Sequence, residues 1–356
     1  MNNNICKKKI NKGVKLFIIS LLALMLFIAF FFIYAIATDY QPAEKEIVFN
    51  NKIKDTIKQQ KFSILSWNIG YCGLGENMDF FYDGGKKVRA SKKETINNLK
   101  NIINFISERD SIDFVLLQEV DTLSKRSYFI NELDSLKTKL KNYFGVFALN
   151  YNVKYVPIPL FSPLGKVKSG LVILSKIKPN ISIRYSFPEN YPMPKKIFML
   201  DRCFLVNKYK LKNGKSLIVI NTHNSAYDNG TLKQGQMLFL KKYIINEYEK
   251  GNYLIIGGDW NQLPPNVSEN KIETKNVIIK NIKKNFLPKS WTWVFDKNTS
   301  TNRSLETKYI SGKSKTSILD FFLISPNINN LNVKTINLHF KKSDHQPVIA
   351  TFDFKI

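Results

Sequence analysis

Polar side chains able to move protons or hold a cation follow several apolar stretches of this sequence. The clearest case is Tyr253-Leu-Ile-Ile-Gly-Gly-Asp259-Trp-Asn261. An apolar run closed by Gly-Gly is typical of a buried strand that ends at a turn, and a continuing strand would put Asp259 and Asn261 on one face. A carboxylate beside a carboxamide can take a proton from a water molecule and hold that water in place. Taken alone, the pattern also fits a polar strand end that caps a loop.

Six further polar residues lie at boundaries of the same kind: Asn68, Glu119 and His223 end apolar runs, Asp320 begins one, and Asp344 and His345 precede the last. A carboxylate and an amide suit a hard, oxygen-preferring cation such as Mg²⁺. Histidines with acidic partners suit proton transfer or charge stabilisation on a phosphoryl group. Each residue alone also fits a turn or a cap. Two of the three histidines of the chain belong to this set, which favours a shared function.

The elements that must position these residues are strands alternating with helices. Apolar or alternating runs predict strands at 62–68, 113–119, 144–150, 170–175, 203–211, 217–223, 253–259, 318–325 and 348–354. Ser91 and Glu94 have capping-box spacing ahead of a helical apolar period, which predicts a helix over 92–109. Further helices are predicted over 126–141 and 230–248. If the last strands run antiparallel to the others, all the polar groups gather at one edge of the sheets, where loops commonly carry function.

The N-terminal part of the chain has the pattern of a membrane anchor. Residues 1–15 are polar and basic, and residues 16–37 contain no charge. As a helix the apolar run would span roughly 33 Å, enough to cross a bilayer. Lysines ahead of it predict a cytoplasmic N-terminus (1–15), a single span (16–37), a tether (38–61) and an extracytoplasmic catalytic domain (62–356). Ala35-Ile-Ala37 also resembles a signal-peptidase site, and cleavage near Ala37 would instead release a secreted protein.

Composition narrows the partners without identifying them. The formal net charge is +26, which favours anionic partners such as nucleic acid, phospholipid head groups or other phosphates. Cys6, Cys72 and Cys203 form no disulfide framework or metal-spacing motif, although Cys72 and Cys203 could pair in an oxidising compartment. Residues 70–93 are rich in glycine and polar side chains, which predicts a long loop rather than core, and 271–315 has no clear pattern.

Six short motifs follow one another along the chain: Ser66-Trp-Asn68, Leu117-Gln-Glu119, Asn221-Thr-His223, Gly257-Gly-Asp-Trp-Asn261, Leu319-Asp320 and Ser343-Asp-His345-Gln-Pro. In this order they resemble the motifs of the endonuclease/exonuclease/phosphatase superfamily, which includes deoxyribonuclease I-like nucleases, abasic-site endonucleases, inositol-phosphate phosphatases and neutral sphingomyelinases. The resemblance covers about 62–356. It implies a four-layered α/β sandwich, two mixed β-sheets flanked by helices, and metal-dependent hydrolysis of a phosphate ester.

The resemblance also implies a metal site for Mg²⁺, or Mn²⁺ in its place. Glu119 would be the main ligand, helped by Asn68 and Asp344.

For the hydrolysis itself, the resemblance implies that Asp259 activates or orients the attacking water and that Asn261 holds a phosphate oxygen. His345, polarised by Asp320, would stabilise charge on the phosphoryl group. His223 would contact the scissile phosphate or protonate the leaving oxygen.

One departure from the family pattern concerns the support of His223. Deoxyribonuclease-like members are expected to carry an Arg-Glu pair on the preceding strand, whereas this chain has Asp201-Arg202-Cys203. Asp201 or Asp228 could take the role of the glutamate. The departure argues against a close deoxyribonuclease analogy and leaves the hydrolase interpretation intact.

The implied substrate is an anionic phosphate ester, either nucleic acid or a phospholipid head group. For a nucleic acid, both endonuclease and exonuclease action stay open. We expect the protein to be a monomer. Phe80-Phe81-Tyr82, Trp291 and Trp293 would suit a lipid interface or base stacking. The alternative is a catalytically silent binding module on the same fold. Loss of one of the polar groups would mark such a module, and none is missing.

Overall fold

The computed structural model describes residues 11–52, 56–188, 191–228, 230–267 and 279–355, so most of the basic N-terminal segment and residues 268–278 lie outside the described part. The chain divides into two compact units, Met1–Asp39 and Tyr40–Ile356. The first contains α1 (Lys12–Ala37), whose N-terminus is capped by the Asn11 side chain accepting from Gly13 N–H. Among the described helices, α1 alone is long and apolar enough to cross a membrane, a property that signal sequences share.

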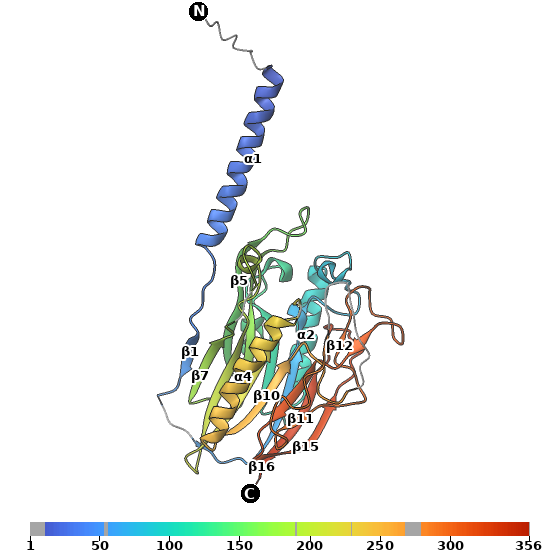
Figure 1. Ribbon diagram of the computed structural model, residues 1–356. Coiled ribbons are helices and arrows are strands. Elements are labelled where there is room, and N and C mark those ends of the chain that lie inside the picture. The colour runs from blue at the N-terminus through green and yellow to red at the C-terminus, as the bar shows by residue number, and fades with distance from the viewer. Residues whose placement is uncertain (1–10, 53–55, 189–190, 229, 268–278, 356) are drawn as a thin grey trace, which may run out of the picture. The chain divides into compact units, whose positions relative to one another are not determined.

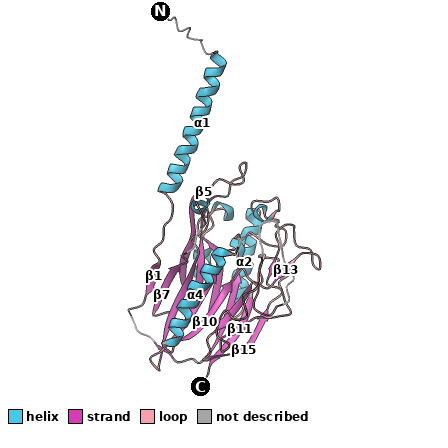
Figure 2. Ribbon diagram, viewed as in Figure 1, coloured by secondary structure: helices cyan, strands magenta, loops and turns pink. Residues whose placement is uncertain are grey.

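The second unit is built on two mixed β-sheets (Figures 1 and 2). The first sheet has the order β1 (Lys45–Asn50), β7 (Ile181–Ser186), β8 (Cys203–Leu211), β9 (Ser216–His223), β10 (Tyr253–Asp259), β14 (Asp320–Ile324), β11 (Thr292–Val294), with β2 (Thr56–Ile57) paired to β8. The second has the order β15 (Ile328–Thr335), β16 (Val348–Phe354), β3 (Lys61–Asn68), β4 (Phe114–Asp121), β6 (Gly165–Ser175), β5 (Phe144–Val156). A small ribbon pairs β12 (Asn302–Arg303) with β13 (Thr316–Ser317).

Helices cover the outer faces of both sheets. They are α2 (Lys92–Ser107), α3 (Glu132–Lys139) and α4 (Thr231–Glu249), with 3₁₀ turns η1 (Gly70–Cys72), η2 (Phe81–Asp83), η3 (Lys125–Ser127) and η4 (Lys195–Phe198). One apolar cluster joins the inner faces of the two sheets, for example Phe114 and Leu116 with Val219 and Phe322. A second lies between the other sheet face and α2 and α3, and a third lies under α4. The predicted four-layered α/β sandwich is confirmed.

The strand directions bring the predicted polar residues to one edge. β3 and β4 are parallel, as are β9 and β10, so their carboxyl ends lie together within each sheet. β14 runs antiparallel to β10 and β16 antiparallel to β3, which brings the beginnings of β14 and β16 to the same edge. The expected antiparallel arrangement of the last strands is confirmed, and so is the capping box of α2.

Three predictions about local structure are wrong. The tether contains strand β1, which pairs with β7 at the edge of the first sheet. The long loop after β3 is partly core, because Tyr71, Leu74, Met78 and Phe80 pack with Leu305. The helix predicted over 126–141 is shorter, beginning at Glu132 behind the Asn131 cap and ending at Lys139.

The possible disulfide between Cys72 and Cys203 is absent. Both thiols are free and buried, and they belong to different apolar clusters on opposite faces of the second sheet. Burial raises the pKa of both thiols, so neither is a reactive thiolate.

Candidate active site

Asn68 connects the two sheets at the edge where their strands end. Its Nδ2 donates to Glu119 Oε1 on β4 and to Asp259 Oδ2 on β10, both at 3.1 Å. Its Oδ1 accepts from Gly70 N–H at 3.0 Å, which orients the amide. Asn68 therefore presents donors to both carboxylates and positions them relative to one another.

Glu119 points into this edge because of a break in the regular strand. Its φ is +57°, and the pairing of β4 with β6 shifts between Leu117 and Val120. Such an irregularity redirects a side chain beside a functional site. The Glu119 side chain remains 23 % exposed, whereas Asp259 is almost fully buried.

His345 and Asp320 form the closest pair of the site. His345 Nδ1 lies 2.7 Å from Asp320 Oδ2, and its Nε2 lies 3.6 Å from Asp259 Oδ2. Burial lowers the pKa of His345, but the Asp320, Asp259 and Asp344 carboxylates outweigh burial and hold it well above its usual value. A charged His345 donates from both ring nitrogens. The atom 2.9 Å from Nε2 is Asn302 Nδ2, a donor, so a charged ring requires the amide of Asn302 to turn until its oxygen faces Nε2.

His223 has the opposite electrostatic character. It is buried at the end of β9, with Nε2 3.5 Å from Asp259 Oδ2 and 3.9 Å from Glu119 Oε1. Burial, with Arg202 and His345 nearby, holds the pKa of His223 well below its usual value, so the ring is neutral. Its Nδ1 is buried without a hydrogen-bond partner in the described part of the chain.

Asp228 does not supply the missing support for His223. Its Oδ2 accepts from Gly230 N–H and Lys233 N–H, both at 3.0 Å, and its Oδ1 lies 3.3 Å from Lys233 Nζ. Asp228 therefore binds the first turn of α4, and of the two candidates for the role of the family glutamate, Asp201 and Asp228, this one does not contact His223 Nδ1.

Asn261 lies beside Asp259, but a turn of the backbone places it there and not a continuous strand. Strand β10 ends at Asp259, and Asn261 has a φ of +51°, so a continuous strand does not place them on one face. Instead, Asn261 N–H donates to Asp259 Oδ1 at 2.9 Å, and its Nδ2 donates to Asn224 O at 2.9 Å.

The donor set fits a hard divalent cation. Burial raises the pKa of Asp344 to about 6, and the charge of Glu119 adds to the effect. A cation among these carboxylates would relieve their repulsion, and oxygen ligands are those that Mg²⁺ prefers. Asp259, Asp320 and His345 also have ligand atoms within 4.8 Å of one another. The 2.7 Å contact already engages Asp320 with His345, so we assign those two residues to a hydrogen-bonded dyad.

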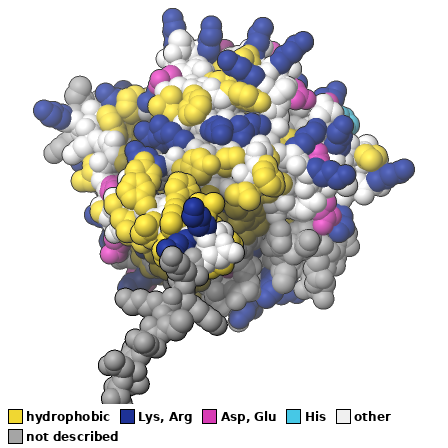
Figure 3. Space-filling view, turned by 90° about the horizontal axis from the view of Figure 1, so that it is seen from above, with side chains coloured by type: hydrophobic (Ala, Val, Ile, Leu, Met, Phe, Trp, Pro, Cys, Tyr) yellow, Lys and Arg dark blue, Asp and Glu magenta, His cyan; other side chains and the backbone are white. Residues whose placement is uncertain are grey.

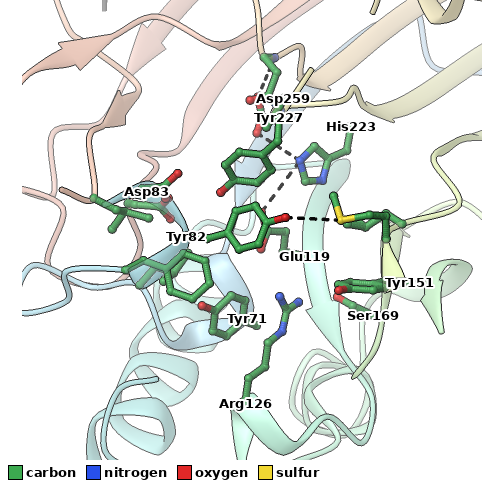
Figure 4. Close-up of a pocket in the computed structure, with 18 of the residues that line it drawn as sticks. Tyr71, Tyr82, Asp83, Glu119, Arg126, Tyr151, Ser169, His223, Tyr227 and Asp259 are labelled. Atoms are coloured by element: carbon green, nitrogen blue, oxygen red, sulfur yellow. Dashed lines mark hydrogen bonds and ion pairs between the residues drawn. The ribbon is translucent and has the colours of Figure 1, made fainter. Parts of the chain in front are cut away.

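These residues surround a cavity of about 270 Å³. Of the predicted residues, Glu119, His223, Asp259, Asn261, Asp344 and His345 line it, while Asn68 and Asp320 contact the lining. Figure 4 shows Tyr82 and Tyr227 in the same pocket, between Asp83 and His223 in that view. Their rings are 4.8 Å apart.

Several residues of the pocket escaped the sequence analysis. Burial raises the pKa of Asp83 to about 7, against a lowering hydrogen bond from Tyr227. Arg126 is buried, donates to both oxygens of Asp121 at 2.9 and 3.0 Å, and lies over the Tyr71 ring. Asp83, Tyr227 and Arg126 do not end apolar runs. The pattern that predicted the other site residues, a polar residue at the boundary of an apolar run, therefore does not indicate them.

The fold and this arrangement define a class of protein. The family model for the endonuclease/exonuclease/phosphatase family matches residues 65–345. The chain belongs to this family, whose members hydrolyse phosphodiester or phosphate-ester bonds and use divalent metal ions. Comparison with the curated proteins gives no significant match.

Solved structures share the fold at low sequence identity. An endonuclease/exonuclease/phosphatase from Beutenbergia cavernae has a TM-score of 0.56 at 15% identity, covering 83% of this chain and 72% of its own. ANGEL2, a 2′,3′-cyclic phosphatase in complex with adenosine-2′,3′-vanadate, has a TM-score of 0.54 at 16% identity, covering 89% and 100%. TDP2 from D. rerio, complexed with a single-strand DNA product, has a TM-score of 0.52 at 14% identity, covering 83% and 100%.

Proposed function

We propose that residues 62–356 form a Mg²⁺- or Mn²⁺-dependent phosphodiesterase, held at a membrane by α1 with its catalytic domain outside the cytoplasm. The observation that carries the proposal is the convergence of Glu119, Asp259 and the His345–Asp320 dyad on one cavity, in a chain of this family. The cavity combines carboxylates that can accept a proton with the charged His345, which can donate a hydrogen bond to an anion.

Glu119 and Asp344 would hold the cation, and Asn68 would orient Glu119 through its 3.1 Å hydrogen bond. When bound, such a cation draws charge from the phosphate oxygens and so favours attack at phosphorus.

Asp259 would accept the proton of the attacking water. Its Oδ1 is engaged by Asn261 N–H, and its Oδ2 is shared by Asn68 and the two histidines at 3.1–3.6 Å, which fixes the carboxylate. Asn261 would contact a phosphate oxygen if its amide, now on Asn224 O, is released.

The two histidines would divide the remaining work. The charged His345, held by Asp320, would stabilise the negative charge that develops on the phosphoryl group. The neutral His223 would contact the scissile phosphate. Its Nε2, 3.5 Å from Asp259 Oδ2, would take up the proton that Asp259 removes from the attacking water and pass it to the leaving oxygen.

The proposed substrate class is the phosphodiester of a nucleic acid or of a phospholipid head group. DNA bound to TDP2 and the adenosine derivative bound to ANGEL2 support phosphate esters in general. Of the aromatic residues that could contact a substrate, Phe80 and Tyr82 line the cavity, whereas Trp291 is buried against Tyr248. Cleavage near Ala37, with secretion of the domain, is the alternative to anchoring.

A substrate panel tests this proposal. The full chain in detergent would be assayed with DNA, RNA, sphingomyelin, phosphoinositides and a soluble aryl phosphodiester, with Mg²⁺ and with chelator. We expect hydrolysis of the aryl diester and of at least one natural class, lost with chelator. Absence of hydrolysis throughout, while Mg²⁺ still binds, would favour the silent binding module.

A further inference from the structure

The loop between β5 and β6 exposes three large apolar side chains in succession along its tip. Ile158 is 43 % exposed, Leu160 78 % and Phe161 98 %. The loop is ordered by its own backbone, since Ser162 N–H donates to Pro159 O and Leu164 N–H to Ile158 O. Figure 1 shows this loop projecting past the ends of the neighbouring strands. Single exposed hydrophobics are ordinary, but a cluster at a projecting tip marks an interaction site.

A second segment, after β4, also exposes two large apolar side chains. Leu123 and Phe129, 41 % and 53 % exposed, follow β4. Their segment is joined to the strand below the tip, because Thr122 N–H and Ser124 Oγ–H both donate to Lys168 O. We call Leu123, Phe129, Ile158, Leu160 and Phe161 the apolar rim.

The charged side chains of the two segments that carry the apolar rim are all basic. Residues 122–131 and 150–170 contain no aspartate or glutamate. They carry lysines whose side chains are exposed or half-buried, namely Lys125, Lys154, Lys166 and Lys168. Figure 3 shows a face of the molecule on which lysine and arginine side chains abound and acidic ones are few. Large apolar side chains bordered by lysines match the interface of a bilayer that contains anionic lipid.

The apolar rim is continuous with the active-site cavity. Val156, Pro157, Ile158 and Leu164, at the base of the same loop, line that cavity. Phe198, Met199 and Leu200 extend its apolar wall. A path of apolar surface therefore leads from the loop tip to the candidate catalytic residues, which suits a substrate with acyl chains better than a polynucleotide.

We propose that the apolar rim inserts into an anionic lipid bilayer and presents the cavity to the phosphate ester of a lipid head group. This rests on the proposed phosphodiesterase function and selects one of its two substrate classes. A nucleic acid would gain stacking from Phe161 but nothing from Leu160. The end of α1 at Ala37 precedes β1 at Lys45 by only a short stretch of chain, so a membrane-spanning α1 would hold the domain near a bilayer.

Insertion is tested first without any use of activity. Phe161→Cys, in a Cys6→Ser background of the full chain, would carry an environment-sensitive fluorophore; Cys72 and Cys203 are buried and free, so they should not label. The protein would be reconstituted in vesicles of phosphatidylcholine with phosphatidylglycerol. Leu331→Cys is the matched control, because it lies on β15, at the opposite edge of the same sheet from β5.

We expect blue-shifted emission and quenching by lipid-attached nitroxide at position 161, and neither at position 331. Equal, water-like emission at both positions would overturn the proposal. Self-quenching at position 161 in detergent without vesicles would also overturn it, since a second copy of the chain would then cover the apolar rim.

Hydrolysis tests the substrate class. Leu160→Ser/Phe161→Ser should lower hydrolysis of the lipid in vesicles at least about tenfold, because two large apolar side chains no longer enter the bilayer. The same variant should keep full activity on the soluble aryl diester, as neither residue lines the cavity. The control Leu238→Ser/Leu331→Ser removes two exposed apolar side chains elsewhere and should change neither activity.

Equal lipid hydrolysis by the wild type and the Leu160→Ser/Phe161→Ser variant would overturn the presentation of lipid to the cavity. If the wild type hydrolyses only nucleic acid, the lipid substrate is overturned and the phosphodiesterase function stands. If it hydrolyses nothing, the aryl diester included, the phosphodiesterase function fails and the lipid substrate fails with it, while the fluorescence result still decides insertion.

Discussion

The hydrogen bond between His345 and Asp320 gives the sharpest prediction. The pair is buried, with Nδ1 and Oδ2 2.7 Å apart. A donor aimed at developing charge contributes about 10²–10³ in kcat, so His345→Ala should cost that factor. A hydrogen bond to a charged group contributes about 1.5–3 kcal/mol. Asp320→Asn should therefore cost about 10- to 150-fold, at 1.4 kcal/mol per tenfold.

The pH profile supplies the second part of that prediction. Nearby carboxylates raise the pKa of His345, so the charged form persists below that raised pKa and is lost above it. Asp320→Asn removes the nearest carboxylate, which should lower this pKa and move the basic limb of the pH–kcat profile to lower pH. Folding would be checked by circular dichroism, and kcat on the aryl diester would be measured for both single variants and the double variant.

The two losses should not multiply, because residues that act as one unit share their effect. We expect the double variant to be no slower than His345→Ala. A double variant whose defect equals the product of the single defects would refute the dyad, and so would an unmoved basic limb in Asp320→Asn.

Three further predictions concern stability and topology. Burial raises the pKa of Asp83 to about 7 from an unfolded value near 4, so between these values the folded protein holds a proton that the unfolded chain releases. The free energy of unfolding should therefore fall as the pH rises from about 4 to 7. Asp83→Asn should flatten the corresponding slope of Tm against pH, and an unchanged slope would contradict this. Arg126→Leu leaves Asp121 buried and unpaired, so it should cost about 3–5 kcal/mol in urea unfolding, and a loss below about 1 kcal/mol would argue against the pair. A C-terminal reporter enzyme that works only in the cytoplasm should stay silent, and a strong signal would reverse the orientation; mature protein beginning at Thr38 would establish cleavage instead.

The strand ends that carry the site were predictable because their signal is local. The 203–211 and 253–259 strands were predicted with the bounds that the structure has, since each apolar run is bordered by turn residues or charges. A polar residue at the end of such a run must lie at an edge of the sheet. Because the last strands run antiparallel to the others, their first residues lie at the same edge.

The pocket wall was not predictable because its residues are placed by tertiary packing. Asp83 ends the 3₁₀ turn η2 and Tyr227 lies in a loop, and no period or spacing in the sequence relates them to one another. The polar, lysine-rich composition of the segment before residue 62 predicts a tether, whereas β1 forms there by pairing with β7, which is distant in sequence. Arg126 is the first residue of the helix predicted over 126–141, yet it precedes α3 and its charge is buried against Asp121. In each case a long-range contact overrides the local pattern.

The most direct test of the central claim is the dependence of aryl phosphodiester hydrolysis on Mg²⁺ concentration, for the full chain and for Glu119→Gln. The substitution keeps the shape of the side chain and removes its charge, so it should weaken cation binding while the fold persists. We expect wild-type activity to disappear with chelator and return with Mg²⁺ or Mn²⁺, and Glu119→Gln to stay inactive at limiting Mg²⁺. Wild-type turnover by Glu119→Gln at limiting Mg²⁺, or wild-type hydrolysis that continues in chelator, would contradict a metal-dependent site at Glu119.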